Sequence, residues 1–176
     1  MPKKYTKKEF EKLSFKQRRL LVAKDVLKQL EAKKYKPAGA VVGKNFYGSF
    51  YVGATPQGTE FDPMLGGTGG VDAQEFFAGR KAPECHVCAI GAACVSAARV
   101  FDRLTLNEVE MLKPLDYLFK EGDMDNMRVA MENDYENVPP NTAQRKKALK
   151  KIFTNIVKNK GDYVRPRSSG RKSVIE

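Results

Sequence analysis

Three cysteines and the single histidine of the chain lie close together, and their donor atoms are the ones best suited to metal chemistry. Cys85, His86, Cys88 and Cys94 supply four nitrogen and sulfur donors, the number that tetrahedral zinc takes. The spacing fits a structural zinc site poorly, because Cys85 and His86 are adjacent and the chain has no other Cys or His. The four residues are therefore weak metal candidates. The alternative is buried thiols that pack as small hydrophobes, so no cofactor is expected.

The same cysteines suggest a second chemistry, that of a nucleophilic thiol at the start of a helix. The helix dipole lowers the pKa of a thiol placed there. A cysteine hydrolase also needs a base within hydrogen-bond reach, usually a histidine. His86 is adjacent to Cys85 in the sequence, and no other histidine can replace it. The sequence therefore disfavours an enzyme and gives no catalytic residue.

Two further motifs resemble ligand-binding loops but miss a required residue. Gly66–Gly70 could hold a phosphate, yet it lacks the Gly-Lys-Ser/Thr ending of the best-known phosphate loop. Asp123–Asn126 resembles the start of a calcium loop, but Arg128 stands where that loop needs glycine. We interpret the first as part of a long loop over residues 53–70 and the second as a helix start.

Charge is distributed unevenly along the chain. Residues 1–36 carry a net charge of +9, residues 37–101 of −1, residues 102–138 of −6 and residues 139–176 of +9, within a total of +11. Two basic ends therefore flank an acidic middle. Such ends could bind a polyanion, or they could fold back onto the acidic segment.

Sequence-independent nucleic-acid binding depends on clustered Lys and Arg, and both ends supply such clusters. The alternative is a solvated helix face with solubilising tails, because no helix-turn-helix, zinc-finger or RNA-recognition signature accompanies the charges. The predicted nucleic-acid-binding residues are Lys3, Lys4, Lys7, Lys8, Arg18, Arg19, Arg145, Lys146, Lys147, Lys150, Lys151, Arg165, Arg167, Arg171 and Lys172.

The elements that would position these residues are mostly helices. Capping boxes at Thr6 and Ser14 predict a short helix and then a long one over about residues 15–34. A segment that is small or apolar on every side predicts a buried central helix over about residues 84–103. Thr142 predicts the start of a last helix, which Gly161 would close at its C′ position. The fold class is therefore mainly α, with five to seven helices and a small β-hairpin near residues 40–52.

The composition suits one domain with tails: a basic segment over residues 1–13, a helical domain over residues 14–161 and a basic tail over residues 162–176. The N-terminus shows no secretory signal, and a cluster of three cysteines is a poor disulfide framework. We therefore expect a cytoplasmic protein with reduced thiols that neither enters nor spans a membrane.

Three short motifs resemble a group of small phage and bacterial proteins. They are Ala23–Leu27, then Cys85–Ala92 with its Cys-x-x-Cys-Ala-Ile-Gly-Ala pattern, and Asn155–Asn159 with its Asn-Ile-x-x-Asn pattern. The resemblance touches most of residues 14–163. It implies a phage-type origin, which would place the protein in a host cell cytoplasm, and it implies no activity and no catalytic residue.

Three functions stay open from the sequence. The first is a non-enzymatic accessory protein that binds a macromolecule, with nucleic acid favoured. The second is a protein-binding inhibitor of a host factor, or a virion component. The third is a cysteine- or metal-dependent enzyme. The oligomeric state does not follow from the sequence.

Overall fold

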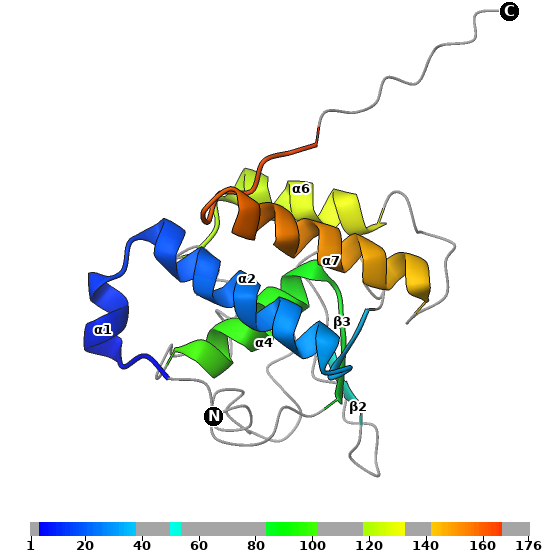
Figure 1. Ribbon diagram of the computed structural model, residues 1–176, viewed down its shortest axis with the longest axis horizontal. Coiled ribbons are helices and arrows are strands. Elements are labelled where there is room, and N and C mark those ends of the chain that lie inside the picture. Colours follow the sequence, from blue (N-terminus) through cyan, green and yellow to red (C-terminus); the bar gives the residue numbers. More distant parts are fainter. Residues whose placement is uncertain (1–3, 38–49, 54–83, 102–117, 133–141, 167–176) are drawn as a thin grey trace, which may run out of the picture.

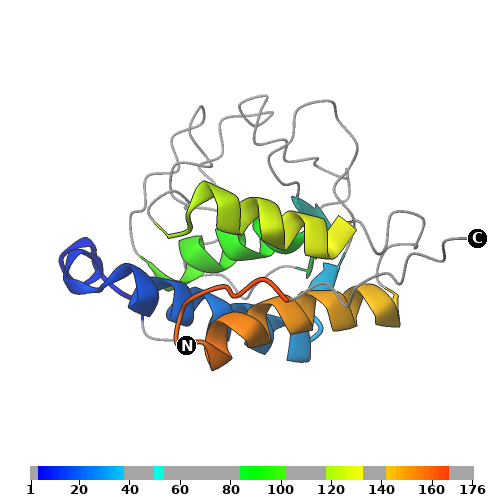
Figure 2. The same ribbon diagram turned by 90° about the horizontal axis from the view of Figure 1, so that it is seen from above.

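Helices dominate the fold, which confirms the predicted mainly α class. Helices α2 (Phe15–Glu31) and α7 (Ala143–Lys158) pack side by side in one layer. Helices α4 (Ala89–Val100) and α6 (Glu121–Glu132) form a second layer behind them (Figures 1 and 2). The computed structural model describes residues 4–37, 50–53, 84–101, 118–132 and 142–166.

The helix starts follow the capping signals of the sequence. Thr6 and Glu9 form a complete capping box before the short helix α1 (Lys7–Lys12), and Ser14 and Gln17 form another before α2. The side chain of Thr142 accepts a hydrogen bond from the Arg145 amide at the start of α7. Each cap satisfies backbone N–H groups that a helix leaves unpaired in its first turn.

Helix α2 ends three residues before the predicted boundary. Lys33 adopts a left-handed conformation with φ 57°, and the Lys34 amide donates to the Gln29 carbonyl. This is the hydrogen-bond pattern of a Schellman motif, which reverses the chain. The chain then enters the first strand, β1 (Tyr35–Pro37).

A small sheet of three strands has the order β1-β3-β2. The central strand β3 (Glu84–Val87) pairs in parallel with β1, so that Tyr35 lies opposite Cys85. It pairs in antiparallel fashion with β2 (Phe50–Gly53), so that Phe50 lies opposite Val87. Residues 50–52 of the predicted hairpin are therefore in a strand, but their partner is β3. The rest of that hairpin lies outside the described residues.

The central helix is shorter than predicted, because residues 84–87 form a strand. Cys88 has extended backbone angles and caps α4, its Sγ accepting from the Gly91 amide at 3.3 Å. From Cys88 onward the burial prediction is confirmed for every side chain that the structure describes up to Ala97. The small residues Ala92 and Ala93 are fully buried in α4, and α2 packs against this helix.

This packing makes a large side chain at Gly91 costly. Gly91 is buried in the first turn of α4, where its amide also completes the Cys88 cap. We expect Gly91→Leu to lower the free energy of unfolding by about 1–3 kcal/mol, because overpacking forces neighbouring side chains off their preferred rotamers. Urea unfolding followed by circular dichroism measures the change. An unchanged midpoint would show that this face of α4 has room.

Candidate nucleic-acid interface

Helix α7 divides cleanly into a buried stripe and a basic surface. Its buried positions recur every three or four residues, as expected for one face of a helix. They are Arg145, Ala148, Leu149, Ile152, Phe153 and Ile156. The exposed positions include Lys146, Lys147, Lys150, Lys151 and Lys158, and the helix contains no Asp or Glu. The surface of α7 that faces away from the core therefore carries positive charges and no negative one.

Helix α2 extends this surface. Its buried residues face α7 and α4, while Lys24 and Lys28 are exposed on the side opposite the buried stripe. Because α2 and α7 lie in one layer, with α4 and α6 on its inner side, their outer sides face the same way (Figure 2). We call this surface the α2–α7 basic face. It consists of Lys24, Lys28, Lys146, Lys147, Lys150, Lys151 and Lys158.

Little negative charge offsets the basic face. Of the two acidic residues in α2, Asp25 is buried and pairs with Arg99 at 3.1 Å, and only Glu31 is exposed. Within the described parts of the chain, no lysine of the basic face makes an ion pair with a carboxylate. Like charges one helical turn apart, such as Lys146 and Lys150, repel each other. The fold therefore maintains a patch of unpaired cations at some cost in stability.

Two arginines of the predicted interface do not belong to it, because they are buried. Arg19 lies on the α2 stripe three residues before Val22, and Arg145 lies on the α7 stripe three residues before Ala148. The helical spacing to these apolar residues was the signal in the sequence. A prediction based on charge alone placed both on the surface and was wrong in that respect.

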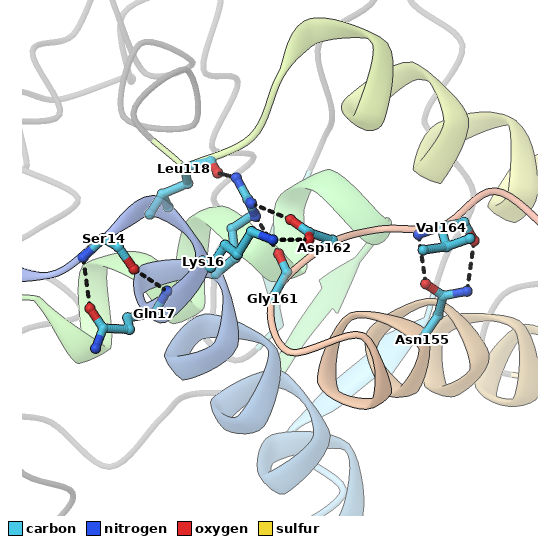
Figure 3. Close-up of polar contacts among 9 residues, drawn as sticks. Ser14, Lys16, Gln17, Leu118, Asn155, Gly161, Asp162 and Val164 are labelled. Carbon is cyan, nitrogen blue, oxygen red and sulfur yellow. Dashed lines mark hydrogen bonds and ion pairs between the residues drawn. The ribbon is translucent and has the colours of Figure 1, made fainter.

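Arg19 instead connects three segments of the chain. Its Nη1 donates to the Leu118 carbonyl at 2.9 Å, its Nη2 donates to Asp162 at 2.8 Å, and its Nε donates to the Gly161 carbonyl (Figure 3). The guanidinium thus joins the start of α2 to Leu118, three residues before α6, and to the turn after α7. This fork of donors can satisfy several carbonyl oxygens at once, which a lysine cannot do.

Asp162 is the charged partner in this cluster, and Lys16 also contacts it at 2.5 Å. The hydrogen bond from Lys16 is the main cause that lowers the pKa of Asp162 below its usual 3.8, and Arg19 lowers it further. A carboxyl with a lowered pKa in the folded state stabilises the fold above its unfolded pKa. That contribution disappears as the pH falls through the folded-state pKa.

We therefore expect Asp162→Asn to reduce the acid sensitivity of the fold. Below about pH 4 the wild type should lose the contribution of this carboxylate, whereas the variant has none to lose. The melting temperatures of the wild type and of Asp162→Asn, measured between pH 7 and pH 2, should converge as the pH falls. Parallel curves over that range would show that the Asp162 carboxylate does not couple to folding.

The segment after α7 turns back and lies against the helix. The Lys160 amide donates to the Val157 carbonyl and the Gly161 amide donates to the Ile156 carbonyl, which is again a Schellman motif. Lys160 takes the left-handed C′ position with φ 53°, and Gly161 follows it. The sequence had predicted Gly161 at C′, one residue later along the chain. Asp162, Tyr163 and Val164, at the start of the predicted tail, thus contact or pack against the helices.

The Asn-Ile-x-x-Asn motif explains how this returning segment is held. The Asn155 side chain accepts from the Val164 amide at 2.9 Å and donates to the Val164 carbonyl at 2.8 Å (Figure 3). Asn159 donates to the backbone and side-chain oxygens of Asn155. Tyr163 is buried, and its burial raises the pKa of its hydroxyl. The motif therefore has a structural role in this chain.

The remaining predicted cations are dispersed. Lys8 and Arg165 are exposed, and Lys4 is half-buried near the bridge between Tyr5 and Phe101. The guanidinium of Arg18 stacks over the Phe10 ring at 3.9 Å, and burial lowers its pKa. Lys7 is in α1, but its side chain is not among those described. Lys3, Arg167, Arg171 and Lys172 lie outside the described residues.

The candidate metal ligands occupy one strand–helix junction. Cys85 and His86 are in β3, Cys88 caps α4, and Cys94 is inside α4. Cys88 is buried, and its Sγ accepts a hydrogen bond from the Gly91 amide. Among the described side chains no group of three or more His, Cys, Asp or Glu could hold a metal ion. The side chains of Cys85, His86 and Cys94 are not described, so this set stays a prediction.

The structure adds Lys24, Lys28 and Lys158 to the predicted interface. Their exposure follows from the same helical periodicity that buries their neighbours. Lys158 is in α7 itself, whereas Lys24 and Lys28 join the α7 lysines only because α2 packs against α7. No helix among the described residues is long and apolar enough to span a membrane. Comparisons of the chain with protein-family models, curated proteins and solved structures find no match.

Proposed function

We propose that the chain is a non-enzymatic accessory protein that binds the phosphate backbone of nucleic acid through the α2–α7 basic face. The observation that supports this most strongly is the lysine surface of α7, where five exposed lysines occur without one acidic residue in the helix and without an ion pair to any described carboxylate. If these side chains served only to keep the protein soluble, a mixture of positive and negative charges would cost less stability, because like charges one turn apart destabilise a helix. The resemblance of the sequence motifs suggests a phage or bacterial origin.

Sequence-independent binding follows from the type of side chain. Lysine ammonium groups contact phosphate as point charges, and phosphate contacts carry no base information. Each contact releases condensed counterions, so affinity falls as salt rises. We therefore expect unrelated sequences to bind with similar affinity and with the same dependence on salt.

Replacing Lys146, Lys147, Lys150 and Lys151 with glutamine tests the proposal. The slope of log K against log salt should become shallower by up to about 3–4, since each lost phosphate contact removes about 0.7–0.9. Binding should weaken alike for every sequence. Gel-shift titrations at several salt concentrations measure both. Absence of binding by the wild type even at low salt would contradict the proposal and favour a protein partner.

A matched pair of variants separates the basic face from overall charge. Lys147→Gln with Lys151→Gln removes two charges from the face, and Lys8→Gln with Lys120→Gln removes two exposed charges outside it. Both reduce the net charge by the same amount. We expect the first to lower affinity and salt slope much more than the second. Equal losses would mean that only the net charge matters.

Thermal melts test a second account, in which the basic helix docks on the acidic segment over residues 102–138. Under that account the glutamine variants lose ion pairs and become less stable. Under ours they lose repulsion, so stability stays the same or rises by less than about 1 kcal/mol. A clear fall in the melting temperature of the four-lysine variant would favour internal docking.

A further inference from the structure

An aromatic side chain is exposed at the beginning of α2, among basic residues. Phe15 is the first residue of the helix and is 52% exposed. A ring of this size is usually buried, and exposing it leaves apolar surface in water. Its neighbours in the chain include Lys12 and Lys16, which are both exposed, although Lys16 also contacts Asp162.

The ring of Phe15 belongs to a stack that is anchored in the core. The Arg18 guanidinium lies 5.1 Å from the Phe15 ring centroid and 3.9 Å from that of Phe10. Arg18 Nε also donates to the Phe10 carbonyl at 3.2 Å. The Phe10 ring meets the fully buried Phe101 edge-to-face, with centroids 4.7 Å apart. A planar cation thus lies between a core aromatic ring and an exposed one.

The backbone that carries Phe15 is also fixed. Ser14 and Gln17 form the capping box on either side of it, with the Ser14 amide donating to Gln17 at 2.8 Å. Arg19, in the next turn, is held by its three acceptors. The ring is therefore held in place while much of its surface remains open. Preorganisation of this kind lowers the entropy cost of binding.

We propose that Phe15 is a stacking platform for an unpaired base, which makes single-stranded nucleic acid the preferred ligand of this protein. This rests on the proposed function, and it names the form of nucleic acid that is bound. Proteins that bind single strands combine a cationic surface with aromatic rings on which bases stack. In a duplex the faces of the bases are stacked inside the helix. Only the terminal base pairs could stack on an exposed protein ring.

The charges around Phe15 favour this ligand over an apolar protein surface. Lys12, Lys16 and Arg18 carry positive charge near the ring, while Glu11 is the exposed acid that acts on Arg18. An apolar partner would have to desolvate these cations, whereas a phosphodiester strand neutralises them.

Ring-removing substitutions provide the test. Affinity for a single-stranded oligonucleotide should fall about 5- to 150-fold in Phe15→Ala, the range that loss of one stacked base gives. The affinity of Phe15→Leu should fall similarly, because this variant keeps an apolar side chain but has no ring. Phe15→Tyr should bind like the wild type. Affinity for a duplex of the same sequence should change less than twofold in all three variants. Phe15 is exposed, so melting temperatures should stay close to that of the wild type.

Val164 supplies the matched control. It is the other exposed large hydrophobic among the described residues, at 51%, and Val164→Ala removes apolar surface away from the stack. It should leave affinity for the single strand unchanged. Phe15→Trp adds a direct signal, since the chain has no tryptophan of its own. Oligothymidylate should quench that fluorescence, and the polyanion heparin should not.

The outcomes distinguish this inference from the proposed function. If the wild type binds no nucleic acid, the proposed function fails, and so does the stacking role. If it binds single strands and duplexes equally and Phe15→Ala changes neither affinity, stacking is overturned while the basic face stands. If Phe15→Ala abolishes a dimer seen by sedimentation and leaves single-strand affinity intact, the ring is a contact between two copies of the chain, which overturns the inference.

Discussion

Arg19→Gln should lower the free energy of unfolding by about 3–5 kcal/mol, which is a large part of the stability of a domain of this size. The substitution removes the donors to the carbonyls of Leu118 and Gly161 and one partner of Asp162. Both carbonyl-bearing residues are buried, so water cannot easily replace the lost donors. Chemical denaturation at neutral pH measures the loss.

Lys16→Gln is the control for this change, because Lys16 contacts the same carboxylate from the surface. The Lys16 side chain is 62% exposed, whereas that of Arg19 is 8% exposed. An exposed pair contributes about 0–1 kcal/mol, so this variant should unfold close to the wild type. Equal destabilisation by the two variants would mean that the charge of Asp162, and not the buried fork, provides the stability.

The same comparison separates structure from function for Arg19. If this residue contacted nucleic acid, Arg19→Gln would weaken binding and leave the fold intact. Because Arg19 is buried, we expect Arg19→Gln to weaken the fold and leave binding intact. At low denaturant concentration the folded fraction of the variant should keep its affinity for nucleic acid. A loss of affinity by fully folded protein would mean that the guanidinium is accessible to the ligand.

The sequence predicted the starts of helices more accurately than their surfaces. Thr6, Ser14 and Thr142 cap helices as expected, because a cap depends on residues three positions apart. The burial of Arg19 depends on acceptors far away in the sequence, which lie 99 and 142–143 residues further along. Charge clustering carries no information about such partners.

The boundary of the central helix failed for a related reason. Residues 84–87, Glu-Cys-His-Val, directly precede the apolar run of α4, and a segment of four residues is too short for its periodicity to separate a strand from a helix. The choice was made by pairing with β1 and β2, both distant in the sequence. The basic face likewise depends partly on local sequence and partly on tertiary packing. The exposed lysines of each helix follow from periodicity, but the surface that they share exists only because α2 packs against α7.

Gly161→Ala is the second substitution with a large expected effect, and we expect it to cost about 2–4 kcal/mol. Gly161 has φ 101°, a conformation that residues with a Cβ rarely adopt. A Cβ built there would lie 2.2 Å from the Lys16 carbonyl oxygen and 2.8 Å from two other backbone atoms of Lys16. Backbone atoms inside a helix cannot rotate away, so the turn after α7 must move off α2.

Gly122→Ala is the matched control, because it adds the same methyl group where nothing lies within 4 Å. Gly122 is in the first turn of α6, and alanine is the better helix former. That variant should gain about 0.4–1 kcal/mol. Thermal melts of the two variants should therefore shift in opposite directions from the wild type. A shift in the same direction would place the strain elsewhere than at the contact with Lys16.

A double variant connects this prediction to the first. Moving the Gly161 turn also moves the carbonyl and the carboxylate that Arg19 holds. Once Arg19 is glutamine, displacing the turn should break fewer interactions. The combined cost of Arg19→Gln and Gly161→Ala should then be smaller than the sum of the two single costs by at least about 0.5 kcal/mol, as expected for residues in contact. Strictly additive costs would show that the close approach of α7 to α2 and the buried guanidinium act independently.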